Sequence, residues 1–66
     1  MDKRKPKPII EFFGWTHLPE HLQNISQPFA VLALDIDNNK DLDPREKAVA
    51  LRKLLESKDA AVRAAL

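Results

Sequence analysis

The chain is 66 residues long, which limits it to one small domain. It has no cysteine, so disulfide bonds and thiolate zinc sites are excluded, and nothing indicates an oxidising compartment. Eleven basic and ten acidic side chains give a formal net charge of +1, and no apolar run is long enough for a transmembrane helix or a signal peptide. A chain this short buries only about 60% of its unfolded surface. A second source of burial is therefore expected, and self-association is the one that this composition leaves open.

Residues 1–8 are predicted to form a flexible basic arm. They hold four cations and two prolines, a composition typical of extended, solvated chain. From residue 8 onward the chain has seven basic and nine acidic side chains, so its body is not expected to bind DNA. The arm has two interpretations, a solvated tail or a segment that closes over an anion.

Residues 9–15 are predicted to form an apolar strap that docks on helices and begins a folded domain of residues 9–66. The strap has five large apolar side chains: Ile9, Ile10, Phe12, Phe13 and Trp15. Packing explains them, but aromatic rings beside a basic arm would also suit stacking on a nucleobase.

A first helix is expected over residues 19–37, interrupted near Pro28. The string from His17 to His21 matches the H-x-x-E-H pattern of zinc proteases, but Pro19 lies between the two histidines and the domain is too small to frame a cleft. Pro28 either kinks a continuous helix or starts a new one capped by Ser26. From residue 29 this helix is apolar most of the way round, which favours burial by more than one neighbour and hence an oligomer.

Residues 35–46 match the spacing of a calcium loop. The oxygen-bearing side chains at its ligand positions are Asp35, Asp37, Asn39, Asp41, Asp43 and Glu46. Against this interpretation, Lys40 stands at the sixth position, where the loop needs glycine, and there is no second loop to pair with. The competing interpretation is an acidic turn that ends in a helix cap.

A second helix is predicted over residues 44–65. Asp43 is suited to the N-cap, Pro44 to the first helical position, and Glu46 gives the spacing of a capping box. One face of the helix carries an apolar seam of Ala48, Leu51, Leu55, Val62 and Ala65, widened by Leu54, Ala61 and Leu66.

Lys58 interrupts this seam, with no carboxylate three or four residues away, whereas Asp59 can pair with Arg63 and Arg52 with Glu56. Lys58 is therefore expected either to extend its ammonium group to water or to bind an anion from elsewhere.

Three patterns carry a resemblance to a known family. They are Trp15, His17, Leu18 and Pro19; Pro28-Phe29 with Leu32-Ala33; and a proline-initiated second helix with Glu46, residues 50–56 and residues 58–63. On these patterns, residues 15–66 resemble the small phage-encoded helical-hairpin sponges that counter bacterial CBASS and related cyclic-nucleotide immunity.

The resemblance implies two antiparallel helices, assembly into an interlocked oligomer such as a hexamer, and sequestration of cyclic di- or trinucleotides without cleavage. The family's base-stacking aromatic corresponds to Trp15 or His17. Its asparagine in the last helix corresponds to Asp59, and its terminal arginine to Ala64, one residue beyond Arg63. Residues 18–39 contain no lysine or arginine, so phosphate contacts are expected from Lys53, Lys58 and Arg63 or from the arm.

The sequence thus predicts an all-α antiparallel two-helix hairpin with an N-terminal strap, assembling as an oligomer. The expected function is non-enzymatic immune evasion in the cytoplasm of the infected bacterial host, without a cofactor and without DNA or membrane as a partner. The alternatives are a calcium-binding helix–loop–helix and a small structural or assembly protein with no small ligand.

Overall fold

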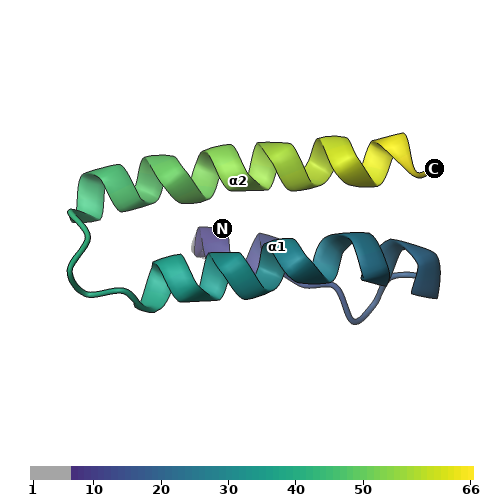
Figure 1. Cartoon of the computed structure of the whole chain (residues 1–66), viewed down its shortest axis with the longest axis horizontal. Coiled ribbons are helices and arrows are strands. Elements are labelled where there is room, and N and C mark those ends of the chain that lie inside the picture. Colours follow the sequence, from purple (N-terminus) through teal and green to yellow (C-terminus); the bar gives the residue numbers. More distant parts are fainter. Residues whose placement is uncertain (1–6) are drawn as a thin grey trace, which may run out of the picture.

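The computed structural model describes residues 7–66, which form one short 3-10 helix and two α-helices (Figure 1). These are η1 (Ile9–Phe13), α1 (Glu20–Asn38) and α2 (Pro44–Ala64). Helices α1 and α2 lie antiparallel and side by side, residues 39–43 join them at one end, and η1 packs against both. The predicted all-α hairpin with a docked strap is confirmed. The predicted basic arm lies outside the described residues, apart from Lys7 and Pro8, which are exposed.

Helix α2 begins as the sequence predicts. The Asp43 carboxylate accepts a hydrogen bond from the backbone N–H of Glu46, with an Oδ2–N distance of 3.0 Å, and Pro44 occupies the first helical position. This bond satisfies one of the N–H groups that have no partner within the first turn. It fixes where the connection ends and α2 starts.

The other end of the connection is held by polar contacts to the end of α1. The backbone N–H of Asp41 donates to Oδ1 of Asn39 at 2.9 Å, an arrangement typical of a turn. Lys47, in the first turn of α2, donates from Nζ to the backbone carbonyl of Asp37 at 3.1 Å. A cation at the carboxyl end of α1 also interacts favourably with the helix dipole.

The core is small and depends on close approach of the two helices. Phe13 from η1 packs with Ala30 and Ala33 of α1 and Leu51 of α2, and Phe13 is only 2% exposed. The alanines leave room for the larger side chains of the strap and of α2, so the three elements meet at one point of close packing.

The face of α2 that packs on α1 differs from the predicted seam at its start. Ala48 is exposed, and the half-buried residue there is Lys47, whose ammonium group bonds across to α1. Leu51 is buried, and the rest of the face is half-buried: Leu54, Leu55, Lys58, Ala61, Val62 and Ala65. The seam is therefore confirmed from Leu51 to Ala65, with Lys58 within it, whereas Leu66, which is expected to widen it, is 85% exposed beyond the end of α2.

Helix α1 runs without a break through Pro28, so the predicted interruption is wrong. Pro28 lacks the N–H that would bond to Asn24, but both residues are exposed, and water can reach the freed carbonyl group. Ser26 does not cap a second helix. It is 0% exposed, on the face of α1 that also buries Leu22 and Ala30, and its hydroxyl has no hydrogen-bond partner within residues 7–66.

Within residues 7–66, neither α1 nor α2 combines the length and the apolar character that crossing a membrane requires.

We expect Asp43→Ala to lower the free energy of unfolding by about 1 kcal/mol, because it removes the N-cap bond of α2. Urea unfolding at fixed protein concentration measures this difference. Asp41→Ala is the control, because Asp41 takes part in the turn through its backbone N–H and not through its carboxylate. Equal effects of the two substitutions would show that the cap contributes nothing.

We expect Ser26→Ala to raise the free energy of unfolding by about 1 kcal/mol or more, because a buried hydroxyl without a partner is costly and alanine favours helix. Ser57→Ala is the control, because Ser57 is an exposed serine on α2 and gains only the difference in helix propensity. Thermal unfolding of both variants separates the two contributions. A loss of stability in Ser26→Ala would contradict the absence of a partner.

Candidate functional site

An open hollow lies between the strap and α1. It has a volume of about 150 Å³ and is lined by Ile10, Phe13, Gly14, Trp15, Ala30 and Leu34. None of these side chains is charged, so the hollow suits an apolar or aromatic group and offers no charge to an anion. Trp15 is half-buried in this wall.

The turn that carries Trp15 and His17 is fastened to α1 by Gln23. Nε2 of Gln23 donates to the carbonyl groups of Thr16 at 3.1 Å and Leu18 at 2.8 Å, and the N–H of Leu18 bonds to the carbonyl group of Trp15. These bonds hold Trp15 beside α1. Gln23 could not be identified from the sequence, because an amide that faces a turn leaves no periodic pattern.

The two histidines lie at the start of α1 and are both exposed. His17 is in the turn and His21 is the second residue of the helix, so they do not share the helical face that a zinc-protease motif needs. Among residues 7–66, no group of three or more histidine and acidic side chains is placed to hold a metal ion.

The structure of residues 35–46 differs from that of a calcium loop. Asp35 and Asp37 belong to α1, which continues to Asn38, and the connection is only residues 39–43. Asp43 is the N-cap of α2. The described chain therefore has a short turn where a twelve-residue loop was considered, because α1 extends farther than that loop allows.

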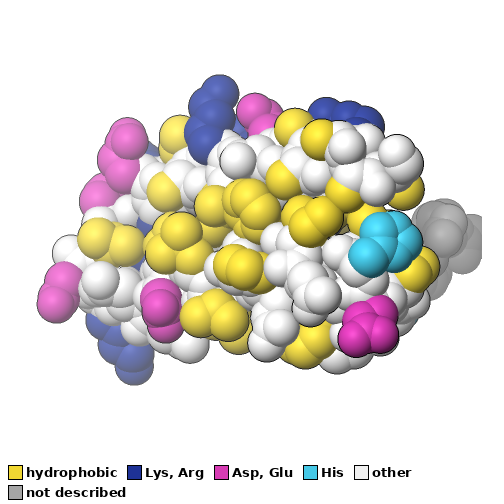
Figure 2. All heavy atoms as spheres, turned by 45° about the vertical axis from the view of Figure 1, so that its right-hand side comes forward, with side chains coloured by type: hydrophobic (Ala, Val, Ile, Leu, Met, Phe, Trp, Pro, Cys, Tyr) yellow, Lys and Arg dark blue, Asp and Glu magenta, His cyan; other side chains and the backbone are white. Residues whose placement is uncertain are grey.

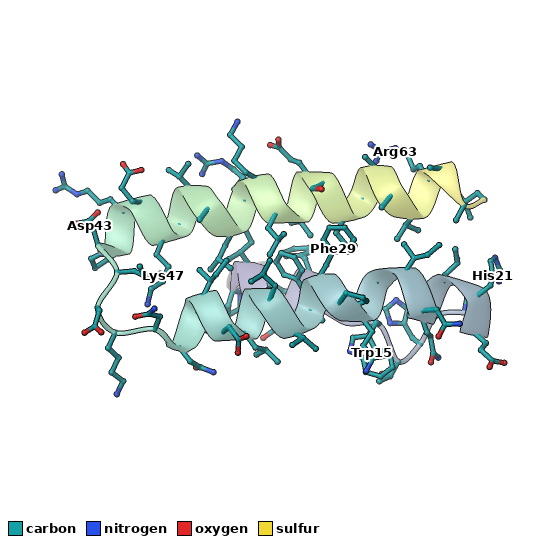
Figure 3. The ribbon with its side chains drawn as sticks, viewed as in Figure 1. Trp15, His21, Phe29, Asp43, Lys47 and Arg63 are labelled. Atoms are coloured by element: carbon teal, nitrogen blue, oxygen red, sulfur yellow. The ribbon has the colours of Figure 1, made fainter. Side chains whose placement is uncertain are left out.

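The cations named as ligand contacts lie mainly on the outer side of α2. Lys53 and Arg63 are exposed. Figure 3 shows Arg63 extending from α2 on the side away from α1, whereas Trp15 lies beside α1 on the side away from α2. One copy of the hairpin therefore does not bring Trp15 together with Arg63.

Of the residues predicted to contact a ligand, Lys58 and Asp59 are brought into direct contact with each other. Nζ of Lys58 lies 2.9 Å from Oδ1 of Asp59. Lys58 has no carboxylate three or four residues away, but its flexible side chain reaches the carboxylate of the adjacent residue, which helical spacing does not indicate. The expected pairs of Asp59 with Arg63 and Arg52 with Glu56 are not formed; the Lys58–Asp59 pair is the one ion pair found within residues 7–66.

Apolar side chains are also exposed on α1 and the strap. Phe12, Val31, Leu32 and Leu34 are each about half exposed. Figure 2 shows hydrophobic side chains gathered across the middle of one face, with lysine and arginine at its margins. This distribution is typical of a surface that is covered by a partner.

The sequence was compared with known proteins. No protein-family profile, no curated protein and no solved structure matches this chain.

Proposed function

We propose that the protein is a non-enzymatic, self-associating hairpin that sequesters cyclic di- or trinucleotide messengers and so counters CBASS-type immunity in the cytoplasm of a phage-infected bacterium. The observation that carries the proposal is the position of Trp15. It forms part of an apolar hollow, on a hairpin that leaves further apolar side chains exposed. An aromatic ring at such a place is suited to stacking on a nucleobase.

Self-association would bring together the aromatic and cationic side chains that one copy holds apart. The hollow is lined by no charged side chain. Lys53 is exposed on α2, and Arg63 extends from the side of α2 that faces away from α1. A cyclic dinucleotide presents both bases and phosphates, so its site needs aromatic and cationic side chains together. Contact between the apolar face of α1 on one copy and a second hairpin would bring the two kinds of side chain near each other. A hexamer, as in the family that the sequence resembles, is one such arrangement.

The first test is the mass of the protein in solution. We expect light scattering at micromolar concentration to give a multiple of 7.5 kDa, because exposed apolar side chains favour association. Val31→Glu should shift the mass toward 7.5 kDa, since it places a charge on the exposed apolar face of α1. Ala60→Glu, at an exposed position of α2, is the control. A parent mass of 7.5 kDa would remove the basis for a shared site.

The second test is ligand binding. Thermal shift against cyclic di- and trinucleotides should reveal a stabilising ligand, because binding to the native state raises apparent stability. In calorimetry, Lys58→Ala should then weaken binding by roughly 1.5–3 kcal/mol, the usual contribution of a charge-assisted contact, and leave the oligomer intact. Lys40→Ala, in the exposed connection, is the control.

Equal affinities of the parent and Lys58→Ala would exclude Lys58 as a phosphate contact. An oligomer that binds none of these nucleotides would contradict the sponge and favour the structural or assembly protein.

A further inference from the structure

The pair of Lys58 and Asp59 occupies an unusual environment for a surface ion pair. The side chain of Lys58 is only 13% exposed and lies in the apolar seam between α1 and α2. The Asp59 side chain is 47% exposed, so its carboxylate faces water while it holds the ammonium group at 2.9 Å. Low exposure of the cation strengthens its attraction to a nearby carboxylate relative to that of a solvated lysine.

The ammonium group is not saturated by this contact. A lysine has three N–H donors, and within the described residues Asp59 is the one partner of Lys58. Two of its three donors therefore have no partner among residues 7–66 and remain for an incoming anion. Such an anion also meets the carboxylate of Asp59, so the pair presents hydrogen-bond donors with a net charge of zero.

We infer that Lys58 and Asp59 together form a phosphate contact that discriminates by charge. It binds the singly charged phosphate of a phosphodiester, and it gives no additional attraction to the second charge on the terminal phosphate of a phosphomonoester. Asp59 is thus a specificity-determining residue, and Lys58 is the residue that touches the phosphate. The inference rests on the proposed function for the identity of the ligand, a cyclic oligonucleotide in which every phosphate is a diester.

The discrimination depends on the second negative charge that a terminal phosphate carries. A terminal phosphate carries about −1.5 to −2 at neutral pH, whereas a diester carries −1. A neutral pair does not attract the additional charge, whereas Lys58 without Asp59 would attract it. One unit charge at about 6 Å in the partly solvated edge of a protein changes affinity by about tenfold. Removing the charge of Asp59 should therefore favour terminal phosphates selectively.

The experiment compares the parent with Asp59→Asn, which keeps the shape of the side chain and removes its charge. Glu56→Gln is the matched control, because it makes the same change of charge on the same helix at an exposed residue outside the ion pair. Calorimetry uses cyclic di-AMP and cyclic di-GMP, the linear dinucleotide with a 5′-phosphate that opening each ring would give, and inorganic pyrophosphate.

We expect the parent to gain no affinity from the terminal phosphate of the linear form. Asp59→Asn should raise the affinity for the cyclic form about tenfold. It should raise the affinity for the linear form and for pyrophosphate by a further factor of about three to ten, because a terminal phosphate carries up to one charge more than a diester. Glu56→Gln should change each by less than about twofold. An unchanged ratio of cyclic to linear affinity in Asp59→Asn, or an equal effect of Glu56→Gln, overturns the inference and leaves the proposed function standing.

The remaining outcomes separate the two proposals. If Asp59→Asn binds pyrophosphate more tightly than the parent does, while neither binds a cyclic dinucleotide and thermal shift finds no cyclic trinucleotide that binds, the charge-discriminating site stands and the sponge is excluded. If no probe and no cyclic trinucleotide binds either protein, both proposals are overturned.

Discussion

The hairpin depends on close contact between a small-residue face of α1 and the larger side chains that pack on it. Ala30 and Ala33 lie against Leu51 of α2, and Phe13 of the strap fills the same contact. Few other side chains are fully buried in residues 7–66, so this contact supplies much of the apolar burial of one copy. A larger residue at either alanine would separate the helices, because a packed core accommodates added volume poorly. The strap is therefore a structural part of the hairpin.

Polar contacts at the connection align the two helices. The Asp43 cap defines the first turn of α2, and from that turn Lys47 reaches the last turn of α1. Since helices are rigid over a few turns, fixing this end also fixes which residues of α2 face α1 farther along. Leu51 then meets the alanines, and Lys58, seven residues on, falls on the same face at the edge of the seam.

The charged side chains of the hairpin lie apart from its apolar hollow, which limits the ligands that one copy could bind. The hollow beside Trp15 is apolar, and the cations of α2 lie elsewhere. A ligand with both bases and phosphates would need contributions from more than one copy, whereas a purely apolar ligand would not. Self-association and ligand binding are thus linked in the proposed sponge, in which the Lys58–Asp59 pair would distinguish one phosphate charge state from another.

The sequence by itself determined the two helices, their order, the cap at Asp43 and the docking strap. These features follow from local chemistry: a carboxylate before Pro44, an apolar period of three and four, and a dense run of large apolar residues. Such signals depend on residues close together in the chain.

Only the tertiary structure decided how α1 passes Pro28, where Ser26 lies and which carboxylate holds Lys58. Helix α1 is continuous through Pro28 and Ser26 is buried within it, although a serine followed closely by a proline is locally typical of a new helix start. The seam confines Lys58 so that its ammonium group meets Asp59, one residue away, instead of a partner at helical spacing. The wall around Trp15 likewise joins the strap to Ala30 and Leu34, and no local pattern links residues so far apart in the chain.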